Sequence, residues 1–320
     1  MFEAGGASMR DKAAALYRSV QEEICKSLEA VDGEGRFHED EWERPGGGGG
    51  QTRVMKGGRL FESAGVNWSE VYGELPPHFN AGVKTPERSF YATGISLVLH
   101  PLTPHIPTVH ANFRFLQRGD LCWFGGGADL TPYYPHLEDA QHFHRTLKGG
   151  CDQLNPAWYP RFKSWCDDYF YLPHRKETRG IGGIFYDYVG VSRQALEHPD
   201  SHPHALEEEV SIERGFEFAS TISRTFLPAY LPIVERRQDE PYGQRERDFQ
   251  LYRRGRYVEF NLIYDRGTTF GLKTGGRTES ILMSMPPMAR WEYQFQGEEG
   301  SREAALQQFL TPRDWLAEQA

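Results

Sequence analysis

The sequence has few cysteines, no long apolar run and no excess of positive charge. Only four of its 320 residues are cysteines, and none forms a C-x-x-C pair, so we expect no structural zinc, iron–sulfur cluster or disulfide framework. No stretch of about 18 apolar residues occurs, which predicts the absence of a membrane span. The net charge of −9 argues against nucleic acid as the main partner. Without a basic, apolar start typical of a secretory signal, the chain is predicted to be cytoplasmic.

The composition that remains is that of a large folded core. Hydrophobic residues make up 38% of the chain, and it contains 20 Phe, 7 Trp and 16 Tyr. Such rings suit a flat, apolar ligand, but they also fill large cores. No internal repeat and no linker between hydrophobic halves is present, so we predict a single domain over residues 1–320.

Periodicity predicts an α+β fold with a mainly antiparallel sheet, because strand-like segments follow one another while the helices come in blocks. The predicted helices span residues 13–28, 135–147, 158–171 and 204–230, with two short ones at the end of the chain. The predicted strands span residues 89–100, 108–116, 120–124, 182–189, 256–265 and 280–285. Residues 32–50, which end in the glycine run Gly46–Gly50, are expected to be a polar connector or a lid.

Polar side chains alternate with apolar ones along two of these strands. In the strand at 108–116, a period of two places His110, Asn112 and Arg114 on one face. Ser96 and His100 share that face if the strand at 89–100 pairs with it. This face is either lined by a ligand or turned to solvent, because such residues are costly to bury without partners.

Other polar residues point more weakly to a site. Gly125–Gly127 allow a ligand to approach the backbone closely, with Asp129 beside it, or they form a turn in which Asp129 caps a helix. Arginine binds carboxylates bidentately, and Arg114, Arg179, Arg266 and Arg277 lie in or beside strand-like, glycine-bordered segments. The scattered histidines suit a divalent metal only weakly on their spacing.

Taken together, these stretches resemble the oxygen-dependent coproporphyrinogen III oxidase family. The segments that carry the resemblance are spread from about residue 50 to residue 292. They read ATGISLVLHP, PTVHANFRF, WFGGGADLTPYY, EDAQHFHRTLK, YPRFKSWCDDYFYLPHRKETRGIGGIFYD and GRYVEFNLIYDRGTTFGLKTGGRTESILMSMPP.

The resemblance implies a reaction and a fold. The family converts coproporphyrinogen III to protoporphyrinogen IX on the route to heme and chlorophyll, with O2 as the electron acceptor. Two propionates are oxidatively decarboxylated to vinyl groups. Its fold is a flat antiparallel sheet with helices on both faces. It forms a homodimer through the segment around residues 257–265.

The resemblance also implies roles for individual residues. His110 takes the position of a proton donor, Arg114 that of a substrate contact, and Asp129 that of a carboxylate on the pyrrole N–H groups. From the chemistry of the reaction, we expect Arg114 to grip the departing carboxylate. The remaining positions are a substrate-binding set and a metal-binding set. The first is Ser96, Asn112, Phe113, Arg114, Gly275, Gly276 and Arg277; the second is His100, His110, His144 and His174.

Alternatives differ in what they require. No cofactor is strictly required, but if the four histidines bind manganese or iron, the protein is a metal-dependent oxygenase. A tetrapyrrole carrier needs the arginines but has no need of His110 and Asp129. The oxygen-independent chemistry needs a C-x-x-x-C-x-x-C motif, which the sequence lacks. With the resemblance in view, the run Gly46–Gly50 is better interpreted as part of a substrate-closing loop.

Overall fold

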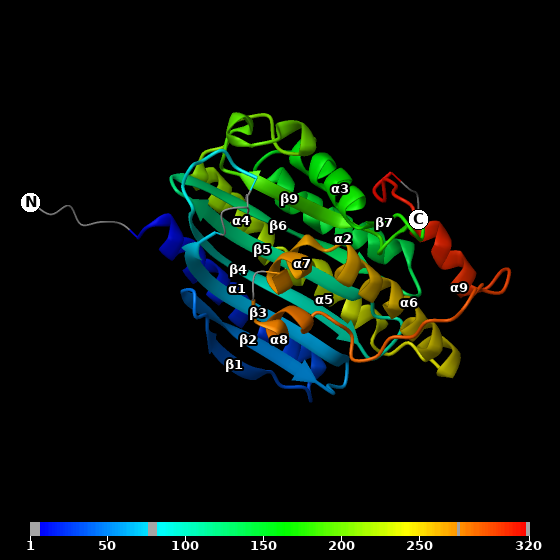
Figure 1. The fold of residues 1–320 in the computed structure, drawn as a ribbon. Helices are drawn as coiled ribbons and strands as arrows, with labels where there is room; N and C mark the ends of the chain where they lie inside the picture. Colours follow the sequence, from blue (N-terminus) through cyan, green and yellow to red (C-terminus); the bar gives the residue numbers. More distant parts are fainter. Residues whose placement is uncertain (1–6, 76–81, 274–275, 318–320) are drawn as a thin grey trace, which may run out of the picture.

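The structure is a computed structural model that describes residues 7–75, 82–273 and 276–317, and it is built around one antiparallel sheet. The sheet has seven strands in the spatial order β1-β2-β3-β4-β5-β6-β9 (Figure 1). Their bounds are β1 (His38–Glu43), β2 (Gly48–Lys56), β3 (Phe61–Glu74), β4 (Ser89–Pro101), β5 (Thr108–Arg118), β6 (Leu121–Thr131) and β9 (Gly183–Val189). Two short strands, β7 (Tyr171–Leu172) and β8 (Glu177–Thr178), pair separately.

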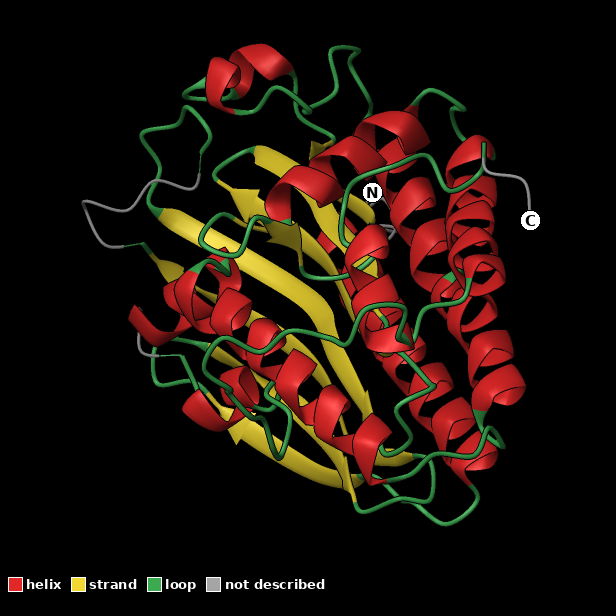
Figure 2. Ribbon diagram, turned by 90° about the vertical axis from the view of Figure 1, so that its right-hand side faces the viewer, coloured by secondary structure: helices red, strands yellow, loops and turns green. Residues whose placement is uncertain are grey.

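Helices cover both faces of the sheet, as Figure 2 shows. One face packs against a layer made of α1 (Met9–Asp32), α2 (Leu137–Asp152), α3 (Trp158–Tyr169), α4 (Ile212–Arg224) and α5 (Phe226–Arg237). The opposite face carries α6 (Gln244–Ile263), α7 (Arg266–Lys273) and α8 (Thr278–Leu282). The chain ends with α9 (Arg302–Ala305) and a 3-10 turn, Leu306–Phe309. This arrangement confirms the predicted α+β class with helices on both faces.

The main core lies between the sheet and the first helix layer. Every second residue of β5, from Val109 to Phe115, is fully buried there, in the same hydrophobic cluster as Tyr17 and Ile24 of α1. The alternate residues of β5 therefore point to the face under α6, α7 and α8. Among the described residues, no helix combines the length and hydrophobicity needed to cross a lipid bilayer.

The prediction for residues 32–50 is wrong. The segment forms the β1–β2 hairpin, with Trp42 opposite Gly50. A side chain at Gly49 would place its Cβ 2.3 Å from the Trp42 carbonyl oxygen, so the glycines permit close strand pairing. Three of the five glycines are part of β2, which is neither a connector nor a loop.

The predictions of two late strands, at residues 256–265 and 280–285, are also wrong, because helices occupy much of both segments. The first lies in α6, whose buried positions Phe249, Arg253, Arg256 and Phe260 follow a helical period. Because Arg253 and Arg256 are charged, the apolar pattern of the sequence does not reveal them as buried helix positions. The second lies at α8 and the turn after it.

The other segments differ in their bounds. The predicted long helix at 204–230 is two helices, since α4 starts after the N-cap Ser211 and gives way to α5 at Thr225. Helix α5 continues through Pro232 to Arg237. The strand predicted at 120–124 runs on to Thr131, so that Gly125–Gly127 lie inside β6.

Candidate active site

A cleft of 230 Å³ lies on the sheet face under α6, α7 and α8. Its floor comes from the middle of β3, β4, β5 and β6, and its walls come from α6, α7, α8 and the end of α3. The described side chains that matter most for chemistry are Asn67, Ser96, His110, Asn112, Arg114, Tyr169, Asp265 and Ser280.

The strand register brings the polar residues of the floor together. Asn67 pairs with Ser96, Ser96 with Asn112, and Asn112 with Gly127, so these four form one row across the sheet. His110 lies in the next row of this face, where it pairs with Asp129. Paired residues lie side by side on the same face. The register therefore confirms that Ser96, His110, Asn112 and Arg114 share one face, and the cleft lies on it.

His110 is held by a buried charge pair. Its Nδ1 lies 2.8 Å from Oδ1 of Asp129, whose carboxylate accepts two further bonds from Nη2 of Arg179, at 2.7 and 2.9 Å. The side chains of Asp129 and Arg179 are each 1% exposed, whereas that of His110 is 22% exposed. With Nδ1 directed at Asp129, Nε2 of His110 is left to face the cleft.

The charges of this pair stabilise each other. Burial alone raises the pKa of Asp129, but the charge of Arg179 and the hydrogen bond from His110 outweigh it and hold the pKa below its usual value. Arg179 donates to Asn261 at 2.7 Å and lies over the ring of Phe170 at 4.2 Å. Asp129 is therefore an ionised partner of His110.

This geometry places Asp129 and Arg179 behind the cleft rather than at its surface. Asp129 does not line the cleft, and its oxygens are occupied by His110 and Arg179, so none is accessible for a pyrrole N–H. Arg179 is buried and bound to Asp129, so it is not placed to hold a ligand carboxylate.

Arg114 enters the cleft from the other end of the same strand face. Its Nη2 donates to Asp187 at 2.8 Å, and its buried Nε has no hydrogen-bond partner among the described residues. Gly125, opposite Arg114 in β6, leaves the space for this pair. A Cβ there would lie 2.9 Å from Nε of Arg114 and 2.4 Å from the Asp187 carboxylate. The arginine is thus held at the cleft with donor capacity left over.

Asp265 supplies a carboxylate that the sequence analysis did not single out. It lies between α6 and α7, where it accepts from the Tyr169 hydroxyl at 2.9 Å and from the Thr268 amide at 2.7 Å. Although burial raises its pKa, these bonds keep the pKa below the usual value. An aspartate three residues before Thr268 is an N-cap signal, which the prediction of a strand here concealed.

Three predicted substrate residues lie elsewhere, and a fourth is not described. Phe113 is fully buried on the opposite face, in the core against α1, because it alternates with Asn112 and Arg114. Gly276 and Arg277 line a neighbouring hollow on the far side of α8, away from His110. Gly275 lies outside the described residues.

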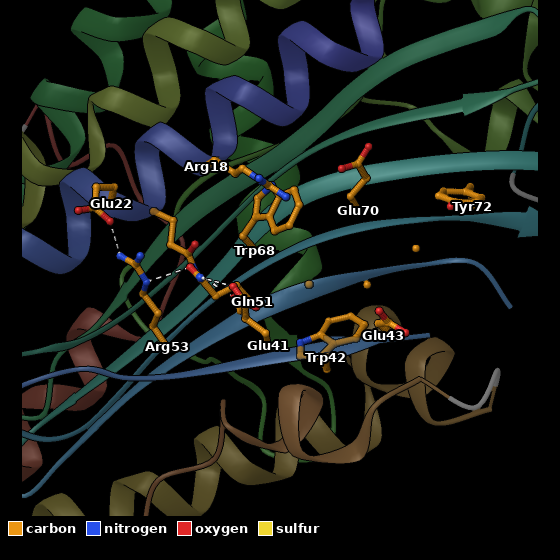
Figure 3. A pocket seen from close by; sticks show the side chains of 14 residues that line it. Arg18, Glu22, Glu41, Trp42, Glu43, Gln51, Arg53, Trp68, Glu70 and Tyr72 are labelled. Carbon is orange, nitrogen blue, oxygen red and sulfur yellow. Dashed lines mark hydrogen bonds and ion pairs between the residues drawn. The ribbon is translucent and has the colours of Figure 1, made fainter. Parts of the chain in front are cut away.

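A larger hollow of 860 Å³ lies on the other face of the sheet, beside α1 (Figure 3). Its arginines are engaged within the protein: Arg53 pairs with Glu22 at 2.6 Å, and Arg18 lies over the ring of Trp68 at 4.0 Å. None of the predicted site residues lines it. The smaller cleft at His110 is therefore the better candidate for an active site.

Comparison with known proteins points to the same family as the sequence resemblance. The sequence model of the coproporphyrinogen III oxidase family matches residues 12–315. The chain belongs to this family. It is 56% identical to the oxygen-dependent coproporphyrinogen-III oxidase of Synechococcus sp. (strain CC9902), over 97% of this chain and 88% of that protein. Against the protein of the same name from Prochlorococcus marinus (strain MIT 9313), it is 54% identical over 96% of this chain and 91% of the relative.

For this member of the coproporphyrinogen III oxidase family, the four predicted metal ligands do not form one site. His110 lies in the cleft, and His174 is bound to Glu259 and Tyr264. Hydrogen bonds engage both ring nitrogens of His100, with Thr108 and Ser284, and both of His144, with Tyr159 and Ile181. Within the described ranges, no group of three or more His, Cys, Asp or Glu side chains is arranged to hold a metal ion. The geometry does not fit the predicted four-histidine site, and we assign no step to a metal.

Proposed function

We propose that the protein converts coproporphyrinogen III to protoporphyrinogen IX by oxidative decarboxylation of two propionates, with O2 as co-substrate. The observation that carries this proposal is His110, held by Asp129 and Arg179, in the same cleft as Arg114. Membership of the coproporphyrinogen III oxidase family supports the choice of substrate. The product is the shared precursor of heme and chlorophyll.

The reaction sets clear demands on the site. For each propionate, the β-carbon loses a hydrogen, the carboxylate leaves as CO2, and O2 takes up two electrons and two protons to become H2O2. One of these protons comes from the β-carbon as part of the hydrogen lost there, and the other must be supplied. The protein must therefore hold the carboxylate, hold the pyrrole N–H groups, and manage a proton.

Residues of the cleft meet these demands. Arg114, with its unpaired Nε, binds a propionate carboxylate, since a guanidinium matches a carboxylate in shape and charge. Asp265, the carboxylate among the described lining residues, accepts from the pyrrole N–H groups in place of Asp129. His110 takes up the proton from solvent at Nε2 and passes it on, while Asp129 fixes its orientation.

Product analysis tests this proposal. Metal-stripped protein is incubated with coproporphyrinogen III in air, and porphyrins and H2O2 are measured, with His110→Asn as the inactive control. Formation of protoporphyrinogen IX by the wild type supports the proposal. Product that forms only after manganese or iron is added supports the reaction and indicates that His100, His110, His144 and His174 bind a metal. Substrate binding with no product under either condition contradicts the proposed enzyme activity and supports the alternative, a tetrapyrrole carrier.

We further propose that the protein is a homodimer. Large apolar side chains are exposed in and after α6, and two of them lie in the segment around residues 257–265 for which the family resemblance implies dimer contact. They are Leu262 (52% exposed), Ile263 (58%), Leu272 (43%), Met288 (50%) and Trp291 (53%). Exposed apolar residues gathered in one segment are typical of an interface. Sedimentation of the wild type and of Ile263→Asp tests this, and a monomeric wild type contradicts it.

We also propose that the protein works in the cytoplasm. All four cysteines are free, and three of them are buried, as expected of a reducing compartment. Cell fractionation followed by immunodetection tests the location, and recovery with secreted proteins contradicts it.

A further inference from the structure

A second hollow adjoins the cleft on the same face of the sheet. Its volume is 720 Å³, and it lies between the β1–β2 hairpin, β3 and the α7–α8 segment. The two spaces share three lining residues, Asn67, Ser280 and Ile281. They are therefore neighbours across one wall.

The cleft alone is small for a tetrapyrrole. Sites for drug-sized ligands have volumes of about 300–1,000 Å³, whereas the cleft has 230 Å³. A ring system with four carboxylates that places one propionate near His110 must extend beyond the cleft. The hollow next to it has the room, and its wall includes the rings of Trp42 and Phe90.

The wall of the hollow also carries an arginine already bound to a carboxylate. Nη2 of Arg277 lies 2.5 Å from Oδ2 of Asp40, and its Nη1 donates to Ser280 at 3.0 Å. Ser280 in turn lies 2.8 Å from the hydroxyl of Thr52. Arg277 is thus joined to Ser280, a residue of the shared wall.

Asp40 reaches Arg277 because of its place on the edge strand. In β1 the residues alternate, so Asp40 and Trp42 face α8, whereas Glu39 and Glu41 face the α1 side. The pair is half-exposed, at 30% for the Arg277 side chain and 41% for that of Asp40. Exposed ion pairs stabilise a fold only slightly, because water solvates the separated charges well. An incoming carboxylate can therefore replace Asp40 at little cost.

The other charges around the hollow are mixed. Arg44 and Lys273 border it, and so do Glu43 and Glu74. Arg44 donates to the carbonyl of Tyr72, and Glu74 lies 3.6 Å from Arg88. Arg277 is the arginine of this hollow that is bound to a carboxylate from another element, so an incoming carboxylate can exchange with that partner.

We propose that Asp40 is an internal substitute for a substrate carboxylate. It holds Arg277 in the substrate-free protein and releases it when a non-reacting propionate of the tetrapyrrole enters the hollow. The inference rests on the proposed function, and it adds a residue of β1 that sets substrate affinity by competing with the substrate.

Kinetics of Asp40→Asn, Arg277→Ala and the double variant test the competition. Asp40→Asn removes the competitor, so we expect KM for coproporphyrinogen III to fall about two- to fivefold, the factor that matches an exposed ion pair. Arg277→Ala should raise KM, and adding Asp40→Asn to it should then change nothing. Glu41→Gln, on the same strand but the opposite face, is the control and should leave KM unchanged.

Three outcomes would overturn the inference. A rise in KM for Asp40→Asn would mean that Asp40 supports the site rather than competes for it. An equal fall in the Arg277→Ala background would mean that Asp40 acts without Arg277. An unchanged KM, in a variant whose melting temperature matches the wild type, would mean that the pair does not exchange.

A binding measurement separates this inference from the proposed function. The same variants are titrated with coproporphyrinogen III under anaerobic conditions, where no oxidation occurs. If the wild type makes no product in air, the proposed reaction fails, but the exchange still predicts a tighter Kd for Asp40→Asn. If the wild type is active and Kd does not tighten, the exchange alone fails.

Discussion

The charge pair behind His110 gives the sharpest prediction, because its two members are almost fully buried. Asp129→Asn keeps the shape of the side chain but removes its charge, which leaves the Arg179 guanidinium, 1% exposed, without a counter-charge. Breaking a buried ion pair in this way costs about 3–5 kcal/mol. We expect the lower end of this range, about 3 kcal/mol, since Arg179 keeps its bond to Asn261 and its contact with the Phe170 ring.

The companion variant Arg179→Met leaves the Asp129 carboxylate buried with His110 as its remaining side-chain partner. We expect a loss of similar size, about 3 kcal/mol. The double variant removes both charges together, so its loss should be smaller than the sum of the two single losses by about 2 kcal/mol or more.

Urea unfolding followed by circular dichroism measures these free energies, at one fixed protein concentration because the proposed dimer would dissociate as it unfolds. Losses that add to within about 0.5 kcal/mol would refute the coupling. In the same set, kcat of Asp129→Asn should fall roughly 100-fold or more, because the imidazole loses the charged acceptor that holds its orientation and tautomer. A near-normal kcat would refute the role of Asp129.

Three other perturbations follow from the same structure. Arg114→Ala should raise KM for coproporphyrinogen III more than it lowers kcat, and an unchanged KM would count against the carboxylate contact. Gly127→Ala places a Cβ 2.2 Å from a carbonyl oxygen of β9, so we expect a loss of about 1–3 kcal/mol in urea unfolding, whereas Gly149→Ala meets nothing within 4 Å and should not destabilise. Burial lowers the pKa of His100 and His144 to about 3, while an unfolded histidine titrates near 6.5. Between these two pKa values the unfolded state binds more protons than the folded state, so the free energy of unfolding is highest above about pH 6.5 and falls as the pH decreases. For each of the two histidines, this free energy should fall by roughly 2 kcal/mol between pH 7 and pH 5. Urea midpoints at the two pH values measure this, and a slope that His144→Gln does not reduce would contradict it.

The part of the site that lies on the sheet could be predicted from the sequence. Strict alternation in β5 places His110, Asn112 and Arg114 on one face, and the structure confirms it. The same alternation places Phe113 on the other face. Its prediction as a substrate contact came from the resemblance alone, and the strand geometry already argued against it.

The part of the site that lies on the helices could not be predicted. The inner face of α6 carries three buried arginines, Arg253, Arg254 and Arg256. Their charges are neutralised by Glu177, Glu62 and Glu259, respectively. An apolar pattern does not reveal a helix whose core face is charged. Asp265 follows directly after this helix, so it was missed for the same reason.

The burial of charge also sets the position of Asp129 apart from the role that the resemblance implies for it. From the strand alone, a carboxylate paired with His110 on the cleft face is expected to meet the ligand. The side chain of Arg179 reaches over it from the segment after β8 and excludes both water and ligand. Such a contact joins residues 50 positions apart, and no local pattern encodes it. Under the proposed function, Asp129 acts on the ligand through His110, so its removal should reduce kcat, whereas loss of Arg114, which lines the cleft, should raise KM.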